Sequence, residues 1–382
     1  MRVQYEKGAK QWQMIYFDYA ASSPVYPSVL DCMDTVSREN YTNPSSLYTL
    51  GYSARKLLHE SRFTLAQSIG AESDEIVFTS GGTEGNNLAL FGVLGANRQK
   101  KHMIVGCAEH PSILSAARAL ALEGFSLSML PCDANGHYSP EELRRMIRPD
   151  TALISLQVAN HETGVLQPIE KIGSITRERR IPLHCDAVAA FGHIPLDVRA
   201  LKIDLLSVSA HKMGGPSGVG FLFARNEIPL VPLFFGGSQE RMLRPGTENL
   251  PAIAGFAKAL SCAEIPASSL VRDRLQTLLL ERFPAARVNG GAVERLPHIL
   301  NITLPGVPSE RLLPLLSAAE IYVSARAACA GGERKPSNVL TAMGLSATQA
   351  SETLRFSSGF GSKLSDADKT SNAIDFAIRN HF

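Results

Sequence analysis

The sequence has few cysteines and almost no excess charge, and each shortage excludes a class of protein. Its 382 residues include six cysteines, and no two of them form a C-x-x-C pair. This usage excludes a disulfide-stapled scaffold or a zinc ribbon, predicts no metal site and indicates a reduced, cytoplasmic protein. The 38 basic residues nearly balance the 36 acidic ones, which leaves a net charge of +2. So small a charge supplies no basic field for nucleic acid or an anionic membrane.

Long apolar runs, targeting features and repeats are also absent from the sequence. No apolar run reaches the ~18 residues that a membrane-spanning helix needs. The first fourteen residues carry charge and lack the apolar stretch of a secretory signal. Hydrophobic residues make up 45% of the chain and charged residues 19%, as in ordinary globular proteins. A chain of this length is too long for one hydrophobic core, so we expect two domains.

Short β-branched runs alternate with helical stretches between residues 75 and 225. Alternation of this kind predicts an α/β fold, with right-handed crossovers and a large, mainly parallel sheet covered by helices on both faces. The predicted strands are 75–79, 102–107, 126–130, 152–158, 181–185, 205–209 and 218–224, and the predicted helices are 86–95, 112–123, 140–148 and 169–179.

The pattern changes after about residue 261, where a smaller α+β region begins. The predicted division is a large domain over 20–261 and a small domain built from 1–19 and 262–382. The elements predicted in the second region are a helix over 268–283, a strand over 298–304 and a helix over 365–380, for which Ser365 is the expected N-cap.

Three strand ends carry residues that suit a phosphorylated cofactor. The turn 80–87, Ser-Gly-Gly-Thr-Glu-Gly-Asn-Asn, follows one strand and opens a helix, whose free N–H groups can bind phosphate. It matches neither the G-x-G-x-x-G nor the Walker pattern, so a dinucleotide or nucleoside triphosphate is unsupported. Asp186 and Lys212 each follow another apolar strand, at the sheet edge where open α/β folds bind ligands. Taken singly, each feature has an ordinary alternative: a plain turn, a capping Asp and a surface Lys.

Together the three features form the minimal set for pyridoxal phosphate. Lys212 would form the Schiff base, Asp186 would keep the pyridine nitrogen protonated, and the glycine turn would bind the phosphate. His110 follows the strand 102–107 and is suited to acid–base catalysis or to stacking on a ring.

Cys329 lies in a run of small residues, Ser-Ala-Arg-Ala-Ala-Cys-Ala-Gly-Gly, over 324–332. A lone cysteine is more often a buried small hydrophobe. Here the Gly-Gly pair indicates an exposed loop, and the cations Arg326, Arg334 and Lys335 favour the thiolate. The pattern therefore favours a reactive thiol.

The sequence as a whole resembles the NifS/IscS-type cysteine desulfurases, which are pyridoxal 5'-phosphate enzymes with the class V aminotransferase fold (fold type I). The resemblance runs from Tyr16 to Ser357. Its most specific segments are Phe78–Glu84, Asn160–Val165, His184–Ala187, Ser209–Lys212 and Arg244–Asn249.

The resemblance implies an activity, partners and site roles. The enzyme would remove sulfur from L-cysteine, giving L-alanine and a persulfide for a sulfur-acceptor protein, and it would be a homodimer. Lys212, His110 and Cys329 would be catalytic, with Cys329 carrying the persulfide. The residues implied to bind the cofactor are Lys212, Asp186, Gly82, Thr83, His161, Ser209, His211 and, from the other subunit, Thr247; those implied to bind substrate are Asn160 and Arg355.

Two positions depart from the family pattern, and two other functions stay open. His161 stands where the family usually has Asn, and Ala189 stands where it usually has Gln. One alternative is a selenocysteine lyase or cysteine-sulfinate desulfinase on the same scaffold, which would depend less on Cys329. The other is a sulfur-relay protein with little turnover, which would stay colourless when the cofactor is added.

Overall fold

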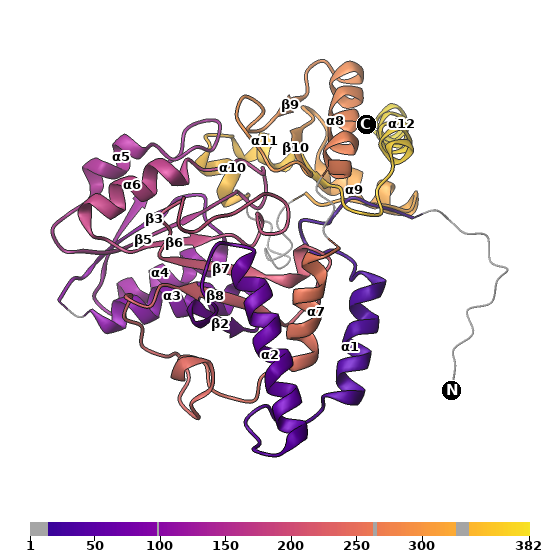
Figure 1. Ribbon diagram of the computed structural model, residues 1–382. Coiled ribbons are helices and arrows are strands. Elements are labelled where there is room, and N and C mark those ends of the chain that lie inside the picture. Colours follow the sequence, from indigo (N-terminus) through magenta and orange to yellow (C-terminus); the bar gives the residue numbers. More distant parts are fainter. Residues whose placement is uncertain (1–13, 98, 263–265, 326–335) are drawn as a thin grey trace.

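The computed structural model describes residues 14–97, 99–262, 266–325 and 336–382. Figure 1 shows a large sheet between layers of helices and, beside it, a smaller group of strands and helices that includes the C-terminal helix. The described strands form a seven-stranded sheet, a three-stranded sheet and a two-stranded pair. No helix within these ranges is both long enough and apolar enough to cross a bilayer.

The seven-stranded sheet confirms the predicted mainly parallel topology. Its strand order is β2-β8-β7-β6-β5-β3-β4. The strands β4, β3, β5, β6 and β7 pair in parallel, whereas β8 runs antiparallel to both β7 and β2. This reversal follows from the connection 210–219, which is too short for a crossover helix. The strands are β2 (Ile76–Thr79), β3 (His102–Gly106), β4 (Ser126–Leu130), β5 (Thr151–Gln157), β6 (Leu183–Asp186), β7 (Leu205–Ser209) and β8 (Gly220–Ala224).

The four helices predicted between these strands are all present. The first of them begins at Gly82, earlier than the prediction of residue 86, because the N-cap Gly81 adopts a φ of 149° that residues with a side chain avoid. The helices of this part of the chain are α1 (Pro27–Glu39), α2 (Thr49–Gln67), α3 (Gly82–Ala96), α4 (Pro111–Leu122), α5 (Pro140–Met146), α6 (Ile169–Arg179) and α7 (Leu250–Leu260).

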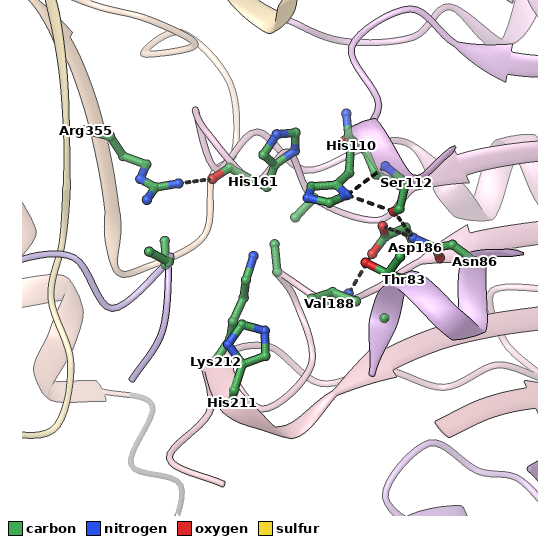
Figure 2. Close-up of a pocket in the computed structure, with 16 residues that line it drawn as sticks. Thr83, Asn86, His110, Ser112, His161, Asp186, Val188, His211, Lys212 and Arg355 are labelled. Carbon is green, nitrogen blue, oxygen red and sulfur yellow. Dashed lines mark hydrogen bonds between the residues drawn. The ribbon is translucent and has the colours of Figure 1, made fainter. Parts of the chain in front are cut away.

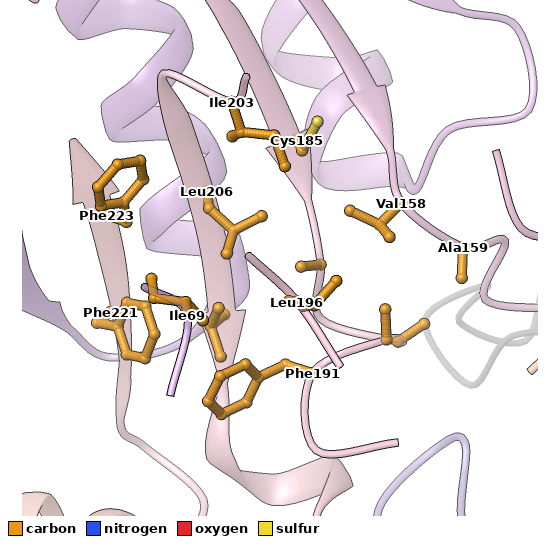
Figure 3. Packing of buried hydrophobic residues seen from close by; sticks show 14 of the residues in the cluster. Ile69, Val158, Ala159, Cys185, Phe191, Leu196, Ile203, Leu206, Phe221 and Phe223 are labelled. Carbon is orange, nitrogen blue, oxygen red and sulfur yellow. The ribbon is translucent and has the colours of Figure 1, made fainter. Parts of the chain in front are cut away.

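Alternate residues of each strand pack on opposite faces of the large sheet. Met103 joins the apolar cluster beneath α3 and α4, whereas its neighbour Ile104 joins the cluster that includes α1, α2, α5, α6 and α7. Figure 3 shows part of this second cluster, where Phe191 and Phe221 meet edge-to-face at 5.6 Å beside Leu206. Burying each aromatic ring stabilises the fold by about 1.5–3 kcal/mol. The sheet is therefore covered on both faces, as its continuous apolar strands predict.

A smaller group of elements, formed by the start of the described chain and by the chain after α7, has its own apolar cluster. Its central strand and its two long helices correspond to the elements predicted over 298–304, 268–283 and 365–380. Residues Ile15 and Phe17, from the start of the described chain, belong to the same cluster. The elements are β1 (Ile15–Tyr16), α8 (Pro266–Arg282), β9 (Arg287–Val288), β10 (Ile299–Thr303), α9 (Ser309–Ala318), β11 (Ile321–Tyr322), β12 (Thr353–Ser357) and α12 (Leu364–His381).

The start of α12 differs from the prediction. Ser365 was predicted as the N-cap, but Lys363 occupies that position and the helix begins at Leu364. The physical reason is Asp366, whose carboxylate accepts a hydrogen bond from the Lys363 backbone N–H at 2.9 Å.

Two short helices connect the smaller group of elements to the large sheet. These are α10 (Asn338–Ala342) and α11 (Ala347–Ser351). Val339, Leu340 and Met343 pack into the cluster beneath the large sheet rather than into the cluster of β10 and β12. The segment therefore fixes the two parts of the chain against each other.

A buried ion pair supports a strained turn between β8 and α7. Glu240, Arg241 and Met242 have φ angles of 45°, 61° and 61°, in the left-handed region that costs a non-glycine residue about 1–2 kcal/mol. The Glu240 carboxylate accepts hydrogen bonds from Arg62 at 2.8 and 2.5 Å and from the Phe78 N–H at 2.7 Å. These three bonds compensate for the strain and tie the turn to α2 and β2.

Candidate active site

The predicted site residues gather where the carboxyl ends of the parallel strands meet. A cavity with about 680 Å³ of empty space, part of it open to solvent, lies at this edge of the large sheet. Figure 2 shows its lining, with Lys212 pointing toward the rings of His161 and His110. The predicted residues that line the cavity are Gly82, Thr83, His110, His161, Asp186, His211, Lys212 and Arg355.

Four predicted residues are not part of this lining. Ser209 is buried at the end of β7, and Thr247 belongs to the segment between the strained turn and α7. The Asn160 carboxamide is engaged in the turn after β5, because its Oδ1 accepts from the Glu162 and Thr163 N–H groups, each at 2.9 Å. Cys329 lies outside the residues that the structure describes. The roles predicted for these four stay predictions.

The glycine turn before α3 brings bare backbone to the cavity. A Cβ atom on Gly82 would lie 2.3 Å from Cγ2 of Val188, a distance that no packing tolerates. A Cβ on Gly81 would lie 3.3 Å from Oγ of Ser209, which places this hydroxyl beside the turn. Gly82 and Thr83 are the first residues of α3. The N–H groups of this first turn have no partners within the helix, so they can bind an anion in the cavity.

A chain of hydrogen bonds runs from Asp186 to His110. The Asp186 carboxylate accepts from the Val188 N–H at 2.9 Å and from Nδ2 of Asn86 at 2.7 Å. Asn86 also donates to Oγ of Ser112 at 2.8 Å, and this hydroxyl lies 2.8 Å from Nδ1 of His110. Asp186 is therefore fixed in orientation from two sides.

The same contacts determine the tautomer of His110. Its Nδ1 accepts a hydrogen bond from the Ser112 backbone N–H at 3.1 Å, so the neutral ring carries its proton on Nε2. Burial lowers the pKa of His110, although the Asp186 carboxylate partly opposes this shift. Asn86 and Ser112 were not predicted, since only the helical register of α3 and α4 reveals that they face each other.

His161 presents an unused nitrogen atom beside His110. The two rings meet edge-to-face with 5.2 Å between their centroids. His161 is 6% exposed, and its Nδ1 has no hydrogen-bond partner among the described residues. Burial, and then the positive charge of nearby groups, holds the pKa of His161 well below its ordinary value. The ring is therefore neutral and has one nitrogen available to a ligand.

Lys212 ends a short 3-10 helix, Ala210–Lys212, that follows β7. Its backbone carbonyl accepts a hydrogen bond from Nε2 of His193 at 3.0 Å. The His193 ring stacks on His298 at 3.8 Å between centroids, and burial lowers the pKa of His193 to about 4. The partly buried ring of His193 and the buried ring of His298 thus support the backbone from which the Lys212 amine reaches the cavity.

Arg355 lines the side of the cavity that lies away from Asp186 (Figure 2). This residue of β12 is 1% exposed and donates to Oδ1 of Asp18 at 2.7 Å and to the His161 carbonyl at 3.0 Å. Its Nε has no partner among the described residues. Burial raises the pKa of Asp18, and the Arg355 guanidinium opposes that shift. Asp18 was not predicted, because its partner lies more than 300 residues away in the sequence.

Comparison with known proteins decides the family. Residues 15–369 match the aminotransferase class-V family. The chain belongs to the class V aminotransferases. It is 42% identical over 366 residues to the cysteine desulfurase IscS of Methanosarcina thermophila. This alignment covers 94% of this chain and 91% of that protein. It is 41% identical over 362 residues to the putative cysteine desulfurase IscS 1 of Bacillus subtilis strain 168, covering 91% and 94%.

Solved structures give the same result for the fold. A NifS-like protein superposes with a TM-score of 0.89 at 32% identity, covering 96% of this chain and 99% of its own. The structure described as SspA in complex with cysteine gives a TM-score of 0.82 at 35% identity, covering 90% and 98%. The class V aminotransferase fold and the resemblance to NifS/IscS proteins, both predicted from the sequence, are thereby confirmed.

The cavity fits the cofactor of this class V aminotransferase family, whose cysteine desulfurases are pyridoxal-phosphate enzymes. It offers a helix N-terminus that only glycine permits, a carboxylate fixed from two sides, a lysine amine and an unpartnered imidazole nitrogen. Within the described ranges, no group of three or more His, Cys, Asp or Glu side chains could bind a metal ion. The helix N-terminus, the fixed carboxylate and the lysine amine suit an anionic organic cofactor.

Proposed function

We propose that this protein is a pyridoxal-phosphate-dependent cysteine desulfurase that converts L-cysteine to L-alanine and retains the sulfur as a persulfide on Cys329. One observation carries the proposal: the Lys212 amine, the Asp186 carboxylate and the N-terminus of α3 meet at one cavity. They do so in a chain that is about 40% identical to curated cysteine desulfurases over nearly its whole length.

The residues around the cavity divide into a phosphate side and a ring side. Gly82 and Thr83, together with Ser209 and His211, would bind the phosphate. Asp186 would pair with the pyridine nitrogen, with His110 beside the ring. When bound, the cofactor supplies an electron sink for negative charge that develops at the substrate Cα.

The chain's own groups would carry the proton transfers and bind the substrate. Lys212 would bind the cofactor covalently and would then move the proton at the substrate Cα, since its side chain lines the same cavity as Asp186 and Arg355. Arg355 would bind the substrate carboxylate through the guanidinium edge that Asp18 leaves free, because a planar guanidinium suits a carboxylate. The Cys329 thiolate would attack the substrate sulfur.

We further propose a homodimer that acts in the cytoplasm and passes sulfur to an acceptor protein. Large apolar side chains are exposed at two places, Leu47 and Tyr48 before and at the N-cap of α2, and Phe234, Phe235 and Met242 between β8 and α7. Residues of both segments line one groove. Exposed large apolar side chains on neighbouring segments are typical of an interface, and in such a dimer Thr247 would reach the cofactor of the other subunit, as the family resemblance implies.

The predicted division into a large domain (20–261) and a small domain (1–19 and 262–382) also stands as a proposal. It is supported by the separate apolar cluster of β10 and β12. The packing of α10 and α11 beneath the large sheet adds a firm connection between the two parts.

The decisive experiment measures alanine and sulfide from L-cysteine, with dithiothreitol present, for the wild type and for Cys329→Ser. The wild type should form both products in equal amounts. Cys329→Ser should still show the change of the visible spectrum on addition of L-cysteine but release little sulfide, because the thiolate is the sulfur acceptor. Turnover that survives Cys329→Ser would favour a selenocysteine lyase or sulfinate desulfinase. Protein that stays colourless with added cofactor would indicate a sulfur relay.

A further inference from the structure

Two cysteines with no part in the proposed reaction lie side by side at the edge of the large sheet. Cys107 follows β3 and Cys132 follows the neighbouring parallel strand β4, and their Sγ atoms are 3.6 Å apart. The structure has no disulfide between them, and both are partly exposed. The backbone N–H of Cys107 donates a hydrogen bond to the Leu130 carbonyl of β4 at 2.9 Å, which fixes the backbone at Cys107. The pairing of β3 with β4 therefore holds the two thiols next to each other.

This separation is close to that of a covalent bond. The two sulfur atoms must approach by about 1.5 Å to reach the ~2.05 Å of a disulfide. Neighbouring backbone positions on paired strands make such an approach possible by side-chain rotation. A metal ion is a poor occupant, because within the described residues no third His, Cys, Asp or Glu completes a set of ligands.

The hydrogen bonds between the thiols make them unequal. The Cys132 thiol donates to the Ala342 carbonyl at the end of α10 at 3.4 Å, and it can turn toward Cys107 when that residue ionises. In the structure the Cys107 thiol donates to Sγ of Cys132. When Cys107 loses its proton, the Cys132 thiol can donate in return, and this contact lowers the pKa of Cys107 to about 7, against the opposing effect of burial. The same contact, with burial, raises the pKa of Cys132. Of the two thiols, Cys107 is therefore the one that ionises more readily and is the better candidate for the nucleophile.

We propose that Cys107 and Cys132 form a redox-active dithiol that closes to a disulfide when a low-molecular-weight disulfide such as oxidised glutathione is in excess. In the first step, the Cys107 thiolate attacks one sulfur of oxidised glutathione, forming a mixed disulfide and releasing one glutathione thiolate. In the second step, Cys132 loses its proton and attacks Sγ of Cys107, releasing the second glutathione thiolate. The protein loses two electrons and two protons, and oxidised glutathione becomes two molecules of reduced glutathione.

The dithiol lies where the cavity wall meets α10. The Ala108 carbonyl, next to Cys107, accepts hydrogen bonds from Nε2 of Gln157 at 3.0 Å and Nδ2 of Asn160 at 3.1 Å, and Gln157 lines the cavity. A disulfide removes the hydrogen that Cys132 donates to Ala342. Oxidation therefore breaks the hydrogen bond that connects Cys132, beside the cavity wall, to the last residue of α10.

Peptide mapping tests the proposal directly, because trypsin separates the two cysteines. Cleavage after Lys101, Arg118 and Arg144 places Cys107 in the peptide 102–118 and Cys132 in 119–144. The reduced holoenzyme is equilibrated with mixtures of reduced and oxidised glutathione, quenched with acid, alkylated and digested. The cross-linked peptide pair should appear as the oxidised fraction rises and should disappear on reduction with dithiothreitol.

Variants assign the two roles. Cys132→Ser should accumulate glutathione on Cys107. Cys107→Ser should form neither a glutathione adduct nor a cross-link at Cys132. Cys262→Ser is the matched control and should titrate like the wild type. The titration should also be unchanged in Cys329→Ser, so a failure of the proposed desulfurase chemistry leaves this test intact. At pH 7, iodoacetamide should modify Cys107 about fivefold faster than Cys32, because a larger thiolate fraction outweighs the lower nucleophilicity.

Phenylarsine oxide, which bridges paired thiols, gives a readout that needs no variant. One equivalent should protect Cys107 and Cys132 from alkylation together and leave Cys262 reactive. The proposal is overturned if both thiols remain alkylatable in glutathione mixtures that oxidise dithiothreitol. Persistent glutathione on Cys107 of the wild type, without the cross-link, would overturn it equally.

Discussion

The buried histidine of β6 makes the stability of the fold depend on pH. His184 is fully buried, and its ring joins β5 to β7 through Oγ of Ser155 at 2.8 Å and Oγ of Ser207 at 2.9 Å. Burial lowers the pKa of His184 from 6.5 to about 4. Between these two values the unfolded chain binds a proton that the folded protein excludes. Folding therefore loses stability as the pH falls from 6.5 toward 4, and the contribution is constant above and below that window.

The magnitude follows from the size of the shift. Each unit of pKa corresponds to about 1.4 kcal/mol, so full protonation costs the folded state about 3 kcal/mol. Between pH 7.5 and pH 5 the loss from this one ring is about 2 kcal/mol. His184→Gln keeps a donor and an acceptor between the two serines but removes the titration. The variant should be less stable at pH 7.5, yet its stability should fall by about 2 kcal/mol less than that of the wild type on going to pH 5.

Urea unfolding followed by circular dichroism measures this difference. The cofactor-free protein is used, so that cofactor binding adds no pH dependence of its own. His59→Gln, at an exposed position of α2, is the matched control and should follow the wild-type pH dependence. If the curves of His184→Gln and the wild type run parallel between pH 7.5 and pH 5, the buried ring is not the source of the linkage and the reasoning fails.

Three further predictions concern the cavity and the strained turn. Borohydride reduction followed by peptide mapping should find the cofactor on Lys212, and an adduct on another lysine would contradict the assignment. Gly82→Ala should weaken cofactor binding by about five- to 150-fold in a spectrophotometric titration, because overpacking against Val188 costs about 1–3 kcal/mol; adding Val188→Ala should recover most of the loss, and no recovery would exclude the clash as the cause. Glu240→Gln should lower the free energy of urea unfolding by about 3–5 kcal/mol, since it leaves the Arg62 charge buried without its partner; a change below about 1 kcal/mol would show that the pair contributes little.

The sequence predicted the parts of the molecule that depend on short-range patterns. The strand ends that carry Gly82, Asp186 and Lys212 could be located because buried parallel strands read as continuous apolar runs, and their carboxyl ends share one edge of the sheet. This rule brings the three residues together without knowledge of any side-chain contact. The antiparallel course of β8 was not predicted, since an apolar run carries no direction.

The contacts that orient these residues were beyond such patterns. The link from Asp186 through Asn86 and Ser112 depends on which faces of α3 and α4 meet, and the Asp18–Arg355 pair joins distant parts of the chain. Both contain ordinary polar residues that would read as surface positions in the sequence. Their role follows from burial, which only the packing of the elements reveals.

The distribution of charge in the cavity explains why it contains so many histidines. His161, His110 and His211 line the wall, and for each of them burial lowers the pKa, with the positive charge of Lys212 adding to the shift. These rings therefore offer hydrogen-bond donors and acceptors without adding charge. The guanidinium of Arg355 supplies positive charge at the side of the cavity where the substrate carboxylate would bind. A cofactor phosphate would then meet the free N–H groups at the start of α3 and the neutral ring of His211, while Arg355 is left to bind an amino-acid carboxylate.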